Sequence, residues 1–107
     1  MHYIKKTKMY KREEILDFLR TNKDSLLSKY SLTKIGIFGS YAREEQTEKS
    51  DIDFILEFED NAKGMYSKKY DLHEYLKSVF KKEVDICTEH SIKPIFKPYI
   101  LKDAIYV

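Results

Sequence analysis

Apolar residues recur along the chain at two different spacings, and these spacings predict which segments form helices and which form strands. In residues 11–20 and 22–30, leucine and isoleucine side chains repeat every three or four positions, which predicts one kinked helix or two short ones. In residues 51–59, apolar and acidic side chains alternate, as is typical of a strand with one buried face. The apolar runs at 34–38 and 81–88 predict two further strands.

The remaining segments complete an alternation of helices and strands. Residues 40–46 hold helix-forming side chains behind Ser40, which we expect to cap a helix. A turn-like sequence is followed by apolar residues at helical spacing between 65 and 81, the pattern of a helix that lies on a sheet. Pro98 is placed to open a last helical turn, and residues 104–107 favour an edge strand. The predicted fold is therefore α/β (α+β): a small mixed sheet of three to four strands flanked by helices.

Composition and charge then narrow the class of protein. The 107 residues fit a single domain, and twenty basic and eighteen acidic side chains, mixed along the chain, argue against nucleic-acid binding driven by phosphate neutralisation. A single cysteine, Cys87, excludes an internal disulfide, and the histidines lack the spacing of metal ligands (His2, His73 and His90). The N-terminus lacks the apolar core of a signal peptide, and no apolar run is long enough to span a membrane. We therefore expect a cytoplasmic protein that binds neither nucleic acid nor membrane.

Two aspartates stand one residue apart where the alternating strand begins. Asp51 and Asp53 project from the same strand face, away from its apolar side chains. Two carboxylates this close raise each other's proton affinity unless a cation lies between them. Oxygen ligands of this kind suit Mg²⁺, which keeps positions free for water and substrate phosphates. The pair predicts part of a magnesium site, and Asp85 is the candidate third ligand if its strand neighbours that of Asp53.

Gly39 and Ser40 precede the aspartate pair, at the point where a predicted strand turns into a helix. Such a turn exposes backbone N–H groups that can bind a phosphate, and the serine hydroxyl can add a donor. Together with metal ions on Asp51 and Asp53, this arrangement suits phosphoryl or nucleotidyl transfer. Little sequence remains to enclose a second substrate, which favours a protein as acceptor. Aromatic residues near the end of the chain are candidates for its docking surface (Phe96, Tyr99 and Tyr106).

The segment GSYAREEQTEKSDIDFIL, residues 39–56, resembles the signature of the DNA polymerase beta type nucleotidyltransferase superfamily, in which Gly-Ser and Asp-x-Asp precede a more distant third aspartate. From KIGIFGSYARE through EVDIC to the end, the chain is similar to minimal nucleotidyltransferases, the MNT antitoxins that act on HEPN ribonuclease toxins. This resemblance implies a nucleotide-binding role for Gly39 and Ser40. It assigns catalytic metal binding to three carboxylates (Asp51, Asp53 and Asp85).

The same resemblance implies a reaction and a partner. The donor would be ATP with two Mg²⁺ ions, and AMP would be transferred to a tyrosine of a HEPN-type toxin, which silences the toxin's RNase activity within a hetero-oligomer. Two alternatives stay open. The chain could be a non-catalytic antitoxin that neutralises the toxin by binding alone, or it could transfer a nucleotide to a small molecule. The second is disfavoured because the relatives that do so carry an extra helical domain.

A few charged residues around these motifs have more than one interpretation. Glu44 stands where the family usually has glycine, and it would be strained if the backbone there requires a positive φ. Arg43 could reach a phosphate or form a structural ion pair with a nearby acid (Asp51, Glu45 or Glu48). Lys68 and Lys69 could approach the triphosphate, but on an amphipathic helix they are more often solvated.

Overall fold

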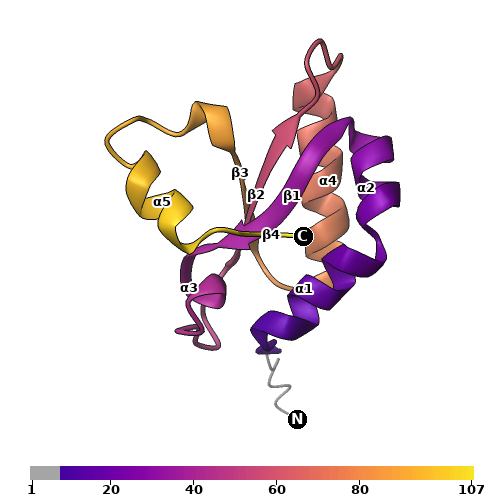
Figure 1. The fold of residues 1–107 in the computed structure, drawn as a ribbon. Helices are drawn as coiled ribbons and strands as arrows, with labels where there is room; N and C mark the ends of the chain where they lie inside the picture. Colours follow the sequence, from indigo (N-terminus) through magenta and orange to yellow (C-terminus); the bar gives the residue numbers. More distant parts are fainter. Residues whose placement is uncertain (1–7) are drawn as a thin grey trace.

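The structure, a computed structural model, describes residues 8–107 and contains a four-stranded sheet with helices on both of its faces (Figure 1). His2 and the other residues before 8, part of the N-terminus that is predicted to lack a signal peptide, lie outside the described part. In chain order the elements are α1 (Arg12–Thr21), α2 (Lys23–Tyr30), β1 (Leu32–Phe38), α3 (Gly39–Ala42), β2 (Ile52–Phe58), α4 (Met65–Phe80), β3 (Val84–Thr88), the 3₁₀ turn η1 (Glu89–Ser91), α5 (Lys97–Asp103) and β4 (Ile105–Tyr106).

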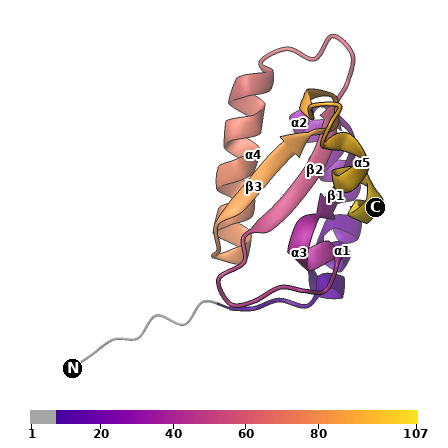
Figure 2. The ribbon, with the colours of Figure 1, turned by 90° about the vertical axis from the view of Figure 1, so that its left-hand side faces the viewer.

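The sheet is mixed, and its strand order is β3-β2-β1-β4. β1 lies antiparallel to both of its neighbours, β2 and β4, whereas β2 and β3 are parallel. Parallel neighbours cannot be joined by a tight turn, and α4 supplies the crossover between them. Figure 2 shows β3, β2 and β1 side by side, with α4 running along them. The predicted fold class, a small mixed sheet flanked by helices, is confirmed.

One face of the sheet carries the core, and α1, α2 and α4 cover it (Figure 1). Alternate residues of β2 point to this face because successive side chains of a strand point to opposite sides. They meet apolar stripes from the helices, and the centre of this cluster is fully buried (Ile15, Leu19, Ile35, Ile37, Ile52, Phe54, Leu56, Leu72 and Leu76). The apolar periodicity of the sequence thus identified the core correctly.

The opposite face holds the acidic residues of β2, and the segment after β3 lies on this side (Figure 1). Ile55 shares this face with Asp53 and is nevertheless fully buried. Beyond it, Glu89 of η1 accepts a hydrogen bond from the Tyr106 hydroxyl of β4 and pairs with Lys34 of β1 at 2.6 Å. These contacts join η1 to both strands, and they lower the pKa of Glu89, with Lys34 the larger cause.

Local chain geometry agrees with the sequence-based expectation in residues 11–30 and departs from it around α3. Residues 11–30 form two helices that separate at Asn22, one of the two predicted arrangements. The helix expected at 40–46 has only four residues, and its N-cap is Phe38, so the prediction that Ser40 caps it is wrong. Glu44 follows with a positive φ of 58°, which ends the helix and explains why it is shorter than its composition suggests.

Candidate active site

The three predicted carboxylates lie at one end of the parallel pair β2 and β3. Asp53 and Asp85 are directly opposite each other in the strand register, and Asp51 stands immediately before β2. The predicted adjacency of the two strands is therefore confirmed. Burial raises the pKa of Asp53 to about 6, and the negative charges of Asp85 and then Asp51 contribute in the same direction, while the Arg43 guanidinium opposes them.

Gly39 stands in the turn that the sequence predicts to bind the nucleotide, and it lies against the carboxylate of Asp53. Its backbone has a φ of 72°, which a residue with a side chain adopts only at a cost, and a Cβ added here would overlap Oδ2 of Asp53. Gly39 follows β1 directly, and Phe38, the last residue of β1, pairs in register with Asp53. The glycine is thus required both by the turn and by the close approach of Asp53, and Ser40 stands next to it in α3.

The three carboxylates supply the oxygen ligands that a hard cation prefers, but their side chains do not converge on one point in this structure. Within residues 8–107, no three His, Cys, Asp or Glu side chains are arranged closely enough to hold a metal ion. Burial is the main reason for the raised pKa of Asp53, and the charges of Asp85 and Asp51 add to it; a cation would neutralise these charges, and the donor set is oxygen only. Asp51, Asp53 and Asp85 therefore have the chemistry of a Mg²⁺ site.

Arg43 lies beside the turn and links it to α5. Its Nε donates to Glu45 at 3.1 Å and its Nη1 donates to Asp103 at 3.5 Å, and the hydrogen bond to Glu45 is the main reason why its pKa is raised. Of the three acids expected as ion-pair partners, only Glu45 is one, and Asp103 was not foreseen. The next residue, Glu44, has the positive φ that the family's glycine would tolerate, and it pairs with Arg12 at 3.3 Å.

A cleft of about 450 Å³ opens between this turn and α5. One wall contains Phe38, Gly39 and Arg43, and the other comes from α5 (Tyr99, Ile100, Lys102 and Asp103). None of the three predicted metal-binding aspartates lines the cleft, but the Asp53 carboxylate lies against Gly39, which does. The α5 wall was not predicted as part of the site. Its residues form no motif, and only the fold places them opposite a glycine sixty residues earlier in the chain.

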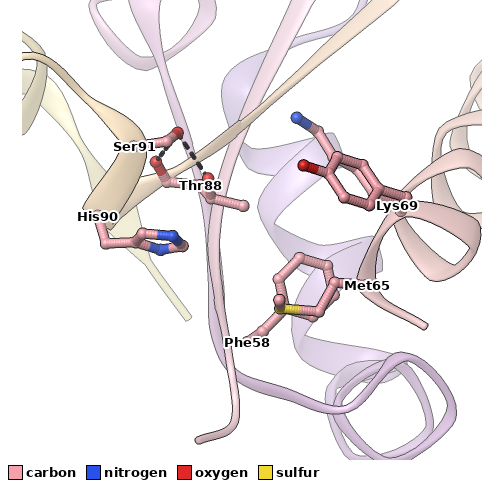
Figure 3. A pocket seen from close by; sticks show the side chains of 7 residues that line it. Phe58, Met65, Lys69, Thr88, His90 and Ser91 are labelled. Atoms are coloured by element: carbon pink, nitrogen blue, oxygen red, sulfur yellow. Dashed lines mark hydrogen bonds between the residues drawn. The ribbon is translucent and has the colours of Figure 1, made fainter. Parts of the chain in front are cut away.

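A smaller cavity of about 230 Å³ lies at the other end of β2 and β3 (Figure 3). Lys69 lines it together with Phe58 and His90, and the Thr88 hydroxyl there donates to Ser91 at 2.6 Å. Asp53 and Phe58 are five residues apart on β2, roughly 16 Å along an extended strand. Lys69 lies toward the Phe58 end of these strands, and its charge also partly offsets the burial that raises the pKa of the Cys87 thiol. Lys68 donates to the Ser31 hydroxyl at 2.8 Å, next to the start of β1. A contact of either lysine with the triphosphate stays a prediction.

Comparison with known proteins identifies the family. The model of the nucleotidyltransferase domain family matches residues 19–107. The chain belongs to the nucleotidyltransferase family. A relative named as a protein adenylyltransferase in Methanocaldococcus jannaschii is 45% identical over 95 residues, covering 88% of this chain and 95% of the relative. The protein adenylyltransferase MntA of Thermococcus cleftensis is 34% identical over 95 residues, covering 89% and 94%. The prediction of a nucleotidyltransferase enzyme resembling the MNT group is confirmed.

Solved structures agree with this fold. A minimal nucleotidyltransferase superposes with a TM-score of 0.75 at 26% identity, covering 92% of this chain and 97% of that one. The chain is also similar in fold to a complex of an MNT antitoxin with a tri-AMPylated HEPN toxin of Shewanella oneidensis, with a TM-score of 0.53, 21% identity and coverage of 89% and 67%. No helix within residues 8–107 combines the length and the apolar character needed to cross a membrane.

Proposed function

We propose that this nucleotidyltransferase is an antitoxin that transfers AMP from ATP to a tyrosine of a HEPN-type RNase toxin and so inactivates it. One observation carries the proposal: the Asp53 carboxylate lies opposite Asp85 and against Gly39, and Gly39 lines a cleft large enough for a small ligand. Two further facts support it. The relatives are named protein adenylyltransferases, and a neighbour in fold is an MNT antitoxin bound to an AMPylated HEPN toxin.

Each part of the site has a role in this proposal. Asp51, Asp53 and Asp85 would hold Mg²⁺, which when bound offsets phosphate charge and favours ionisation of the attacking hydroxyl. Gly39 and Ser40 bind the triphosphate through backbone N–H groups and the serine hydroxyl. The acceptor oxygen forms a bond to the α-phosphorus as the bond to the β-phosphate oxygen breaks, so that pyrophosphate leaves and the hydroxyl proton is lost to a nearby base or to water.

The lining of the cleft carries two positive side chains, Arg43 and Lys102, against one negative one, Asp103, and this balance favours a phosphate group. Arg43 is held in place by Glu45 and Asp103. An arginine ordered in this way loses less freedom when it contacts a phosphate than a mobile side chain would. Arg43 is therefore a candidate phosphate contact in addition to its structural role.

The test is the intact mass of a co-expressed HEPN-type toxin before and after incubation with Mg²⁺ and ATP. The proposal requires a gain of one or more AMP units with the native chain and no gain with the Asp51→Asn/Asp53→Asn variant. Mapping the modified residue by peptide fragmentation checks that the acceptor is a tyrosine. A toxin that stays unmodified while bound and inhibited would instead establish neutralisation by binding alone.

A further inference from the structure

Residues 93–102, here called the arm, connect η1 to the end of α5 and project from the face of the sheet opposite α1, α2 and α4 (Figure 1). No residue of α5 is buried. Three large apolar side chains of the arm are mostly exposed: Ile95 at 72%, Phe96 at 54% and Tyr99 at 74%. A helix normally buries one face against its own domain, so the arm presents apolar surface that this chain does not cover.

The charged side chains of the arm are all positive. The arm contains Lys93, Lys97 and Lys102 and no acidic residue. Asp103, the nearest acid along the chain, pairs with Arg43 at 3.5 Å, while Lys97 is near enough to Glu89 to help lower the pKa of that carboxyl. The salt bridges of residues 8–107 include none to Lys93 or Lys102. A surface that combines exposed apolar side chains with lysines is complementary to an apolar patch that carries carboxylates.

The arm borders the catalytic cleft directly. Tyr99 and Lys102 line the cleft opposite Gly39, while Ile95 and Phe96 lie further along the same short segment. A protein that covers Ile95 and Phe96 is therefore held beside the cleft mouth. This position is the one that an acceptor side chain must reach if it is to attack a nucleotide bound there.

We propose that the arm is the docking surface for the protein that accepts AMP, and that this acceptor meets it with an apolar patch bordered by acidic side chains. The inference rests on the proposed function, since it takes the acceptor to be a protein. The residues of this docking surface differ from those that the sequence analysis proposed. Tyr106 is not part of the surface, because it lies in β4 and its hydroxyl is bonded to Glu89, whereas Ile95 is part of it.

The first experiment compares Ile95→Ser/Phe96→Ser with the native chain in binding and modifying a co-expressed HEPN-type toxin. Neither residue lines the cleft, and neither is part of the core. The dissociation constant should rise by about 30-fold or more, as for removal of central apolar contacts. Transfer of AMP at low toxin concentration should fall in proportion. The matched control is Tyr70→Ser, which removes an aromatic side chain of similar exposure, 65%, from α4 on the opposite face of the sheet.

A second variant, Lys93→Glu/Lys97→Glu, tests the charge without removing apolar surface. It should slow association by about 10-fold or more at low salt, with the difference shrinking as salt is added. The proposed function requires that Mg²⁺ and ATP raise the melting temperature of the native chain, and every variant is first checked for the same rise. A retained rise shows that the nucleotide site is intact, so a loss of transfer then reports docking alone.

Three results would overturn the inference. One is unchanged toxin affinity in both arm variants, and another is an equal loss in Tyr70→Ser, which would move the interface to α4. The third is that sedimentation finds the native chain dimeric and the arm variants monomeric while toxin binding is unaffected, because the arm would then contact a second copy. A toxin that binds through the arm but is never AMPylated would refute the proposed function and keep the docking surface as a binding site.

Discussion

Replacing Asp53 by asparagine should make the ligand-free protein more stable while abolishing its activity. Asparagine has nearly the same shape as aspartate, so it fits beside Gly39, but it carries no charge to be repelled by Asp85 and Asp51. In the native chain Asp53 has a pKa of about 6 against 3.8 for an unperturbed aspartate. A carboxyl group with a raised pKa in the folded state costs stability once it ionises.

The sign and size of the effect follow from that difference. Below pH 3.8 Asp53 is protonated in both the folded and the unfolded state and costs nothing; the penalty grows as the pH rises from 3.8 to about 6 and is complete above that. The full difference would correspond to about 3 kcal/mol. Because the side chain is only half-buried and solvent screens its charge, we expect about 1 kcal/mol. For a domain of this size such a gain raises the melting temperature by roughly 4–8 °C.

Urea unfolding followed by circular dichroism, in EDTA at pH 3.5 and pH 8, measures this prediction. The advantage of Asp53→Asn over the native chain should be small at pH 3.5 and close to its full value at pH 8. Glu59→Gln, which removes an exposed carboxylate just beyond β2, should show little pH-dependent difference. Asp53→Asn should also lose the melting-temperature rise caused by Mg²⁺ and ATP. A variant less stable than the native chain at pH 8, or an advantage independent of pH, would refute the argument from charge repulsion.

Three further substitutions test local features of the fold. Glu44→Gly should be more stable than Glu44→Ala by about 1 kcal/mol in urea unfolding, because only glycine adopts the positive φ at no cost; equal stability would contradict the assigned strain. Gly39→Ala should destabilise the chain by about 1–3 kcal/mol and abolish the thermal shift with Mg²⁺ and ATP, since its Cβ displaces Asp53; a native shift would rule out the close approach. Tyr106→Phe should cost about 1 kcal/mol through the lost hydrogen bond to Glu89, and a neutral effect in thermal unfolding would show that this bond adds no stability.

The sequence predicted those parts of the fold that depend on periodicity. The strand β2 and the helix α4 follow from alternation and from a helical stripe, and both lie within one residue of the expected bounds, at Ile52–Phe58 and Met65–Phe80. The four-residue length of α3 was not predictable from composition. Its neighbouring residues favour helix, but the positive φ of Glu44 is imposed by the route of the chain toward Asp51 and not by the intrinsic preference of glutamate.

For the candidate site, the sequence could name residues but not their separations. Asp53 and Asp85 stand out as aspartates on two short strands, and only the strand order shows that they are direct neighbours. Likewise, nothing in the sequence places Tyr99 or Lys102 opposite Gly39, because no spacing rule relates the end of the chain to a turn sixty residues away. The role of Asp103 as a partner of Arg43 was missed for the same reason.

The two-residue strand β4 has a consequence for how proteins of this kind can diverge. β3 and β4 fix the two ends of the segment between them on opposite edges of the sheet, so residues 89–104 form a closed loop. Doubling the length of such a loop raises its closure cost by only about 0.6 kcal/mol. Insertions or exchanges within it therefore leave the carboxylates on β2 and β3 in place. An enzyme built in this way can acquire a different recognition loop, and with it a different α5 wall of the cleft, while its carboxylates stay in place.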